Sequence, residues 1–101
     1  VESVVPGAEV PDLLLHALKS LADPTRLRIL RYLAAQPLTP TELARRLRLR
    51  PPTVIHHLNT LRLAGLVHIT VSENNARRYA ARLETLKGIN TALEEFLGKQ
   101  D

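Results

Sequence analysis

The chain has 101 residues, no cysteine and a formal net charge of +4 at neutral pH. This length suffices for one domain with a single core, and the missing cysteines exclude a disulfide framework, a thiolate metal site and a catalytic thiol. No segment approaches the roughly 18 apolar residues of a membrane span and no signal peptide opens the chain, so we expect a cytoplasmic protein without a membrane partner.

Residues 1–10 show no periodic apolar pattern, and Pro6-Gly7 is a turn signal, so we expect a flexible N-terminal segment or linker. The chain contains no methionine, not even at position 1. We therefore keep open the alternative that the chain is a module excised from a larger protein.

A first helix is predicted from Pro11 to Leu21, with Asp12 in the first turn, where a carboxylate meets the positive end of the helix dipole. Its leucines cover more than one stripe of its surface: Leu13, Leu14, Leu15, Leu18 and Leu21. In so small a domain, we expect such a helix to share part of its surface with a second subunit.

Asp23 followed by Pro24 predicts the N-cap and first residue of a second helix, which Pro37 ends. We expect this helix to point four residues inward: Leu27, Leu30, Leu33 and Ala34. Three residues should then lie on its outward face: Arg28, Arg31 and Ala35.

Residues 39–42 form a capping box, in which the Thr39 and Glu42 side chains each accept a hydrogen bond from the other residue's backbone N–H. The short helix that follows, through Leu47, is basic on its outward face, with Arg45, Arg46 and Arg48 outward and Leu43, Ala44 and Leu47 inward. A tight turn then leads to a further helix, which makes a helix-turn-helix.

That further helix spans residues 51–64, between Pro51 and Gly65. Its buried face is predicted from an i, i+4, i+7 pattern: Val54, Leu58 and Leu61. Its opposite side is polar and cationic, with Ile55, His56, Asn59 and Arg62. A helix buried along one side and basic along the other suits insertion into a groove of DNA.

Residues 67–71 alternate between apolar and polar side chains, which predicts a strand. Residues 73–76 are a turn, since asparagine tolerates positive φ, and residues 77–82 form the return strand. This hairpin would be the wing of a winged helix-turn-helix. We therefore expect a mainly α (α+β) fold of about five helices with a two-stranded β-hairpin, in which residues 11–101 form a winged-helix DNA-binding domain. The alternative is a winged-helix module for protein interaction or DNA binding excised from a larger protein.

The last helix is expected from Leu83 or Thr85 to Leu97, with apolar residues three and four apart. We expect the two terminal helices of one subunit to pack against those of a second across a two-fold axis. The predicted dimer-interface residues are Leu13, Leu14, Leu18, Leu86, Ile89, Leu93 and Phe96.

Charge supports a polyanion as the partner. Residues 26–82 hold eleven arginines and two glutamates, a net charge of +9, whereas residues 1–25 carry −3 and residues 83–101 carry −2. A basic centre between acidic ends is the electrostatic footprint of a nucleic-acid binder whose termini serve another purpose.

Three motifs together resemble one known family: Leu21-Ala22-Asp23-Pro24-Thr25-Arg26-Leu27-Arg28-Ile29-Leu30, Thr41-Glu42-Leu43-Ala44, and Pro52-Thr53-Val54-Ile55-His56-His57-Leu58 with its continuation at 61–67. The chain resembles, over about residues 11–97, the arsenical-resistance repressor (ArsR-like) family of winged-helix regulators. The resemblance implies a homodimer that binds an operator palindrome in double-stranded DNA and regulates transcription, most simply as a repressor. Metal-sensing members carry Cys in the helix matching 39–47 or Asp and His in the last helix; the first has no Cys or His here and the second no His, so metal sensing is not implied.

In the family, DNA contacts cluster at the start of the recognition helix, where many relatives carry Ser or Gln at the positions of Arg50, Pro51 and Ile55. Two prolines remove N–H donors that could meet a phosphate, and Arg48 and Arg50 can supply positive charge instead. We therefore expect strong phosphate contact and narrow base readout. The predicted DNA-binding residues are Thr41, Arg48, Arg50, Pro52, Thr53, Ile55, His56, Asn59, Arg77 and Arg78.

Alternatives remain for some of these residues. Ile55 could contact a thymine methyl group or the protein's own core, and each wing arginine could be an ordinary solvated side chain. His56 and His57 point about 100° apart on a helix, so we expect a groove-facing His56, a half-buried His57 and no histidine metal site. No phosphate loop, nucleophile elbow or HExxH motif appears, so neither catalysis nor a cofactor is expected, and no polar constellation identifies an effector.

Overall fold

The computed structural model describes residues 9–98, so most of the predicted linker at 1–10 lies outside the described residues. Between residues 9 and 98 the chain forms five helices and one antiparallel two-stranded sheet, in the order α1 (Asp12–Leu21), α2 (Pro24–Ala35), α3 (Pro40–Leu47), α4 (Pro51–Leu63), β1 (Val67–Val71), β2 (Arg77–Ala81) and α5 (Leu83–Gly98). The predicted winged helix-turn-helix is confirmed. None of these helices combines the length and the apolar composition that a bilayer crossing requires.

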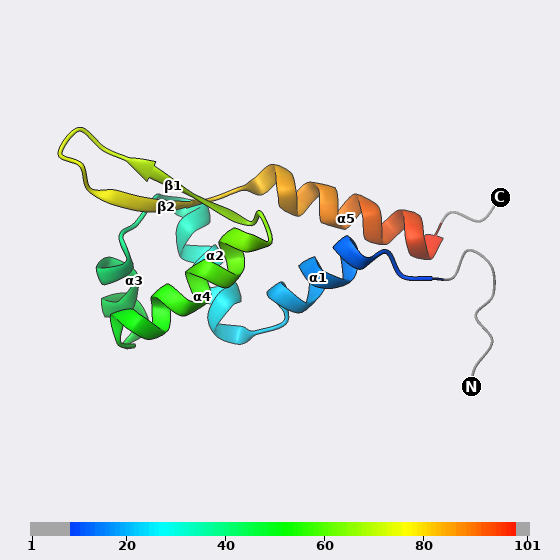
Figure 1. The fold of residues 1–101 in the computed structure, drawn as a ribbon, viewed down its shortest axis with the longest axis horizontal. Helices are drawn as coiled ribbons and strands as arrows, with labels where there is room; N and C mark the ends of the chain where they lie inside the picture. Colours follow the sequence, from blue (N-terminus) through cyan, green and yellow to red (C-terminus); the bar gives the residue numbers. More distant parts are fainter. Residues whose placement is uncertain (1–8, 99–101) are drawn as a thin grey trace.

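The core lies between α2, α3, α4 and the hairpin (Figure 1). Its largest fully buried side chains are Ile29, Leu43, Val54, Leu58, Leu61, Leu66 and Val67. The predicted inner face of α4 is confirmed, since all three of its apolar residues are among them. Branched aliphatic side chains fill this small core almost alone; Tyr79 of β2 is the one aromatic residue among those buried in it.

The inward face of α2 differs from the predicted one. Leu27 is 52% exposed and Ala34 is also exposed, whereas Ile29 is fully buried. Leu30 and Leu33 are buried as expected. The apolar residues of this helix allow two overlapping stripes that share Leu30 and Leu33, and the contacts of α2 with α4 and β2 select the stripe containing Ile29.

Side-chain caps start α2 and α3, as predicted. The Asp23 carboxylate accepts a hydrogen bond from the Arg26 backbone N–H at 3.0 Å, and this bond lowers the pKa of Asp23. The Thr39 hydroxyl accepts from the Glu42 N–H at 3.1 Å, and the Glu42 carboxylate accepts from the Thr39 N–H at 2.8 Å. The second bond lowers the pKa of Glu42. Both carboxylates therefore stay ionised at helix starts, where negative charge is favoured.

The end of α4 is a Schellman motif around Gly65. Gly65 has φ of 74°, a left-handed conformation that glycine adopts without steric cost. The Leu66 N–H donates to the Leu61 carbonyl at 2.9 Å, and the Gly65 N–H donates to the Arg62 carbonyl at 2.9 Å. Because Leu61 and Leu66 are both fully buried, the turn into the wing is fastened to the core.

The hairpin is anchored to the helices by a backbone bridge that sequence reasoning did not foresee. Val67 pairs with Ala81 at one end of the ladder and Val71 with Arg77 at the other. Leu38, between α2 and α3, exchanges two further hydrogen bonds with Tyr79, at 3.1 and 2.8 Å. Pairing depends on two segments about 40 residues apart, so no local pattern reveals it.

The terminal helices lie side by side and extend away from the core (Figure 1). The radius of gyration is 16.3 Å, larger than the roughly 13 Å of a compact domain of about 100 residues. This extension leaves apolar surface uncovered: Leu13 of α1 is 85% exposed.

Candidate nucleic-acid interface

The outer side of α4 is exposed within the described residues, as predicted. Its exposed residues include Pro52, Thr53, Ile55, His56 and Asn59, and their spacing of three and four places them along one side of the helix. Ile55 is 40% exposed, which argues against the alternative that it packs into the protein's own core. The helix therefore offers one apolar and several hydrogen-bonding side chains to a groove.

The start of α4 lacks the amide cluster that commonly binds an anion. Arg50 is the N-cap, with extended backbone and no side-chain cap. Its carbonyl accepts from the N–H groups of Thr53 and Val54, at 3.0 and 3.2 Å, and the two prolines between them have no N–H to offer. Positive charge at this helix start therefore comes from side chains, and Arg48 and Arg50 are both exposed.

Arg48 sits in a strained position at the turn between α3 and α4. Its φ of 57° and ψ of 44° are left-handed, a conformation that glycine normally supplies. The Leu49 N–H donates to the Ala44 carbonyl at 2.9 Å, and the Arg48 N–H donates to the Arg45 carbonyl at 3.4 Å. The turn is thus a second Schellman motif, with an arginine at the position glycine fills after α4.

Replacing Arg48 by Gly should stabilise the fold while weakening contact with a polyanion. Relief of the left-handed strain is expected to raise the free energy of unfolding by about 0.5–1 kcal/mol, measured by urea denaturation. As a control, Arg45→Gly, inside the same helix, should lower it by about 1 kcal/mol. A loss of stability for Arg48→Gly similar to that of the control would contradict the proposed strain.

The turn of the wing is held by its own polar side chains. Asn75 has φ of 62°, which confirms the expectation that an asparagine here accepts positive φ. Ser72 hydrogen-bonds to Asn74, and the Arg78 guanidinium donates to the Ser72 hydroxyl at 3.0 Å. Arg77 is exposed, whereas Arg78 is half-buried. In the free chain Arg78 therefore braces the turn, and Arg77 is the more accessible of the two wing arginines.

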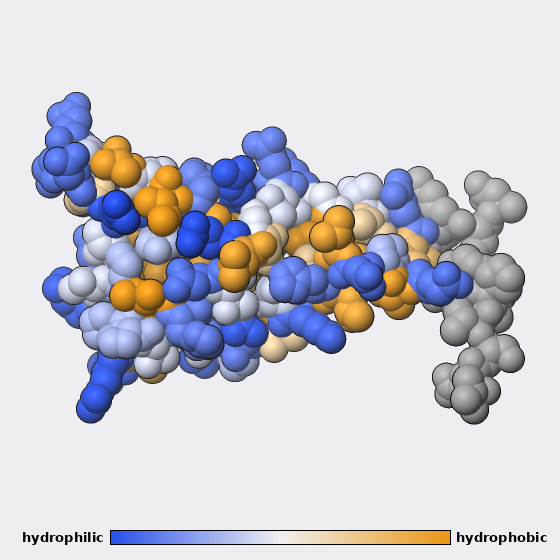
Figure 2. Space-filling model, viewed as in Figure 1, coloured by the Kyte–Doolittle hydropathy of each residue, from blue (hydrophilic) through white to orange (hydrophobic). Residues whose placement is uncertain are grey.

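These elements share one end of the molecule. The start of α4, helix α3 and the tip of the wing lie at the end opposite to the far end of α5 (Figure 1). On the face drawn in Figure 2, hydrophilic side chains cover most of this end, with a few hydrophobic side chains among them. Thr41, at the start of α3, is also exposed, so every predicted DNA-binding residue except Arg78 is readily accessible.

A basic cavity between α2 and α3 was not predicted. It has a volume of about 320 Å³ and is lined by Arg28, Arg31, Tyr32, Ala35 and Arg46. The guanidinium of Arg46 lies 5.8 Å from the centre of the Tyr32 ring, within range of a cation–π interaction. Outward-facing arginines of α2 and α3 thus converge on one cavity. The periodic pattern of each helix, taken alone, could not predict this, because it does not say how the two helices pack.

Arg26 and His57 form a second unpredicted contact. The Arg26 Nη1 and the His57 Nδ1 are 3.2 Å apart, which joins the start of α2 to the middle of α4. His57 is half-buried, as expected. In the sequence Arg26 belongs to the Asp-Pro-Thr-Arg motif. Its place three residues after the Asp23 cap is the one local signal for its position at the start of α2.

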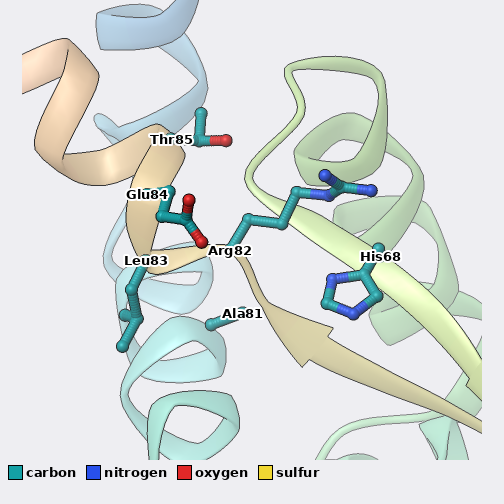
Figure 3. A pocket seen from close by; sticks show the side chains of 6 residues that line it. All are labelled: His68, Ala81, Arg82, Leu83, Glu84 and Thr85. Atoms are coloured by element: carbon teal, nitrogen blue, oxygen red, sulfur yellow. The ribbon is translucent and has the colours of Figure 1, made fainter.

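A second cavity, of about 370 Å³, lies where the wing meets α5 and is lined by His68, Ala81, Arg82, Leu83, Glu84 and Thr85. Figure 3 shows the guanidinium of Arg82 over the hairpin that carries His68, with Glu84 and Thr85 coming from the start of α5. The Nδ1 atom of His68 is buried without a hydrogen-bond partner. Within residues 9–98 no three His, Cys, Asp or Glu side chains come together as metal ligands.

An apolar groove runs between α1 and α5. Its volume is about 390 Å³, and it is lined by Pro11, Leu13, Leu14, Ala17, Thr85, Gly88, Ile89 and Ala92. Figure 2 shows hydrophobic atoms gathered along these two helices. Leu14 is already buried within the single chain; Leu18, Leu86, Ile89, Leu93 and Phe96 are half-buried. Leu13 is the predicted interface residue that protrudes most.

Comparison with known proteins points to one family. The family model described as bacterial regulatory protein, arsR family, matches residues 23–68, which contain the second, third and fourth helices and the start of the wing. No curated protein sequence matches the chain.

Several solved structures are similar to the chain over most of their length. An ArsR-like transcriptional regulator from a Rhodococcus species is 30% identical, with a TM-score of 0.75 over 82% of this chain and 77% of that one. HlyU from Vibrio cholerae is 30% identical, with a TM-score of 0.64 over 86% of this chain and 94% of that one. NolR from Sinorhizobium fredii is 25% identical, with a TM-score of 0.73 over 99% of this chain and all of that one.

Proposed function

Because this chain belongs to the ArsR family of bacterial transcriptional regulators, we propose that it is a homodimeric repressor that binds a specific palindromic site in double-stranded DNA. The observation that carries this proposal is the exposed side of α4, which presents polar side chains beside Arg48 and Arg50. Regulators of this family are not normally enzymes, and the proposal requires neither catalysis nor a cofactor. It places the protein in the cytoplasm, where bacterial DNA lies.

We assign base readout to the exposed side of α4 in the major groove. Thr53, His56 and Asn59 supply hydrogen-bonding groups, and Ile55 supplies an apolar surface for a thymine methyl group. Pro52 is exposed on the same side and contributes van der Waals contact with the DNA, because proline has no backbone N–H to donate. Few side chains of this face can donate to base edges, which supports a short, narrowly read half-site.

We assign phosphate contact to the flanking elements. Arg48 and Arg50 stand at the start of α4, and Thr41 stands at the start of α3. Arg77 is exposed on the wing. Arg78 can also contact a phosphate if its guanidinium gives up its hydrogen bond to the Ser72 hydroxyl. Such contacts set position and affinity and carry little sequence information.

Dimerisation would come from the groove between α1 and α5. The uncovered apolar face and the extended shape support a second copy as its occupant, since a two-fold interface requires a self-complementary surface. We propose direct contacts for Leu13, Leu18, Leu86, Ile89, Leu93 and Phe96, with Leu14 supporting the face from within. Two copies then present two α4 helices to half-sites about 10–10.5 base pairs apart.

Selection of bound duplexes from a random pool tests this function directly. Enrichment of a palindrome with half-sites about one helical turn apart is expected. The operator function would be refuted if the selection enriched no particular sequence and if binding to DNA disappeared at moderate salt. That result would favour the alternative of an interaction module belonging to a larger protein.

Two substitutions should separate phosphate contact from base readout. Arg50→Ala is expected to weaken binding to all duplexes similarly and to reduce the salt slope by about one unit. His56→Ala is expected to cost about 1–3 kcal/mol on the selected sequence, with little change on random DNA. Fluorescence anisotropy over a series of salt concentrations measures both, and each variant is the control for the other. A changed base preference with an unchanged slope for Arg50→Ala, or equal losses on both duplexes for His56→Ala, would contradict these roles.

A further inference from the structure

Arg26 links the first two helices through backbone carbonyls. Its Nε donates to the Ser20 carbonyl at 2.7 Å, and its Nη2 donates to the Lys19 carbonyl at 3.5 Å. Both carbonyls belong to the last turn of α1, where helical carbonyls lack intrahelical partners and favour a cation. The Arg26 backbone N–H is held in turn by the Asp23 carboxylate. The position of this guanidinium is therefore determined by both α1 and α2.

The remaining arm of the same guanidinium reaches the recognition helix. Its Nη1 lies 3.2 Å from the Nδ1 of His57. A guanidinium can only donate, so His57 must accept at Nδ1 and carry its proton on Nε2. This requires a neutral imidazole, because a doubly protonated ring has no acceptor and would place two positive groups against each other.

We propose that the Arg26–His57 hydrogen bond fixes the angle of α4 relative to α1, and that protonation of His57 breaks it and thereby weakens DNA binding in mild acid. The inference rests on the proposed function, since its readout is affinity for DNA. Arg26 and His57 are positioning residues in this scheme, because His57 lies half-buried behind the exposed side of α4.

The angle between α1 and α4 matters because it sets the distance between the two α4 helices of the proposed dimer. Helix α1 belongs to the proposed dimer interface, and α4 carries base readout. In a two-fold dimer any rotation of α4 against α1 is repeated in the partner subunit. Both rotations change the distance between the two α4 helices. A hydrogen bond that joins α1 to α4 through one guanidinium therefore acts on half-site spacing.

The charged and titratable groups that act on His57 are Asp23 and Arg26 from the start of α2 and His56 from α4 itself. Burial lowers the pKa of His57 below its ordinary value of 6.5; Arg26 and His56 lower it further, and Asp23 opposes them. At pH 8 the ring is neutral in both folded and unfolded chains. As the pH falls below 6.5 the unfolded chain takes up the proton first, so proton uptake by His57 works against the bonded arrangement.

The test compares wild type with His57→Asn between pH 8 and pH 5.5 at constant salt. The Asn amide oxygen can replace Nδ1 as the acceptor and does not titrate. We expect similar affinities at pH 8. At pH 5.5, one unit below the ordinary pKa, the wild type should bind up to about tenfold more weakly than the variant. His16→Asn, which removes the exposed histidine of α1, should leave the wild-type profile unchanged.

A second variant, at Arg26, tests the same contact from the donor side. Arg26→Met removes the guanidinium and offers no N–H donor in its place, so it should weaken binding at pH 8. In this background the further change His57→Asn should no longer alter the pH profile. Parallel profiles of wild type and His57→Asn, with normal binding at pH 8, would overturn the role of the contact and leave the proposed function intact. Failure of the wild type to bind any selected duplex at pH 8 would instead refute the DNA-binding function itself.

Discussion

Replacing Leu58 by Ala is expected to lower the free energy of unfolding by about 2–5 kcal/mol. Leu58 is completely buried at the centre of the inner face of α4, in the cluster that also holds Leu61 and Val54. The removed methyl groups lose their burial, and the closely packed surroundings cannot collapse fully into the space. In a domain of about 100 residues such a loss is a large part of the total stability of about 5–15 kcal/mol.

Leu63→Ala is the matched control, because Leu63 lies on the same helix and is 78% exposed. This substitution should change the free energy of unfolding by no more than about 0.5 kcal/mol. Urea denaturation followed by circular dichroism measures both variants. Similar small effects for the two would mean that α4 is not packed as described.

Leu13→Asn is expected to raise the dissociation constant of the proposed dimer at least about a hundredfold, and to weaken DNA binding by a comparable factor at low protein concentration. Leu13 protrudes beside the groove between α1 and α5. Burying a leucine contributes about 2 kcal/mol, and a two-fold dimer loses two of them. Together they correspond to more than about two factors of ten in affinity.

Sedimentation velocity over a range of concentrations measures this effect, with Leu27→Asn as the control. Leu27 is a second exposed leucine, on α2 and outside the terminal helices. Its replacement should leave the assembly state unchanged. Because Leu13 makes little contact within the chain, its replacement should not alter the thermal unfolding of the monomer. A wild-type chain that is monomeric at all concentrations would refute dimerisation through this face.

Local signals predicted the elements well. Each of these signals depends only on residues that are close in sequence, so the rest of the fold does not change it. They are the caps at Asp23 and Thr39, the glycine at position 65 and the alternating pattern of 67–71. The i, i+4, i+7 pattern of α4 succeeded for a similar reason: one side of that helix is apolar without ambiguity, and the other side offers no competing stripe.

The failures occurred where a local pattern allowed more than one solution. In α2, two stripes fit the helical period, and only packing against α4 and β2 selected Ile29 over Leu27. The left-handed turn at Arg48 went unforeseen, because an arginine gives no local sign of positive φ. Here the tertiary course of the chain imposes a conformation that the residue itself disfavours.

The sequence by itself determined the order of the elements, the winged helix-turn-helix class and the side of α4 left free for DNA, because periodicity, capping and charge are local properties. Only the tertiary structure decided which residues from distant segments meet: Leu38 with Tyr79 across the wing, and Arg26 with His57 between two helices. Those contacts join residues 31 or more positions apart, and their geometry depends on how the helices pack around the shared core. Packing is a property of the whole chain, so no single stretch of the sequence could reveal it.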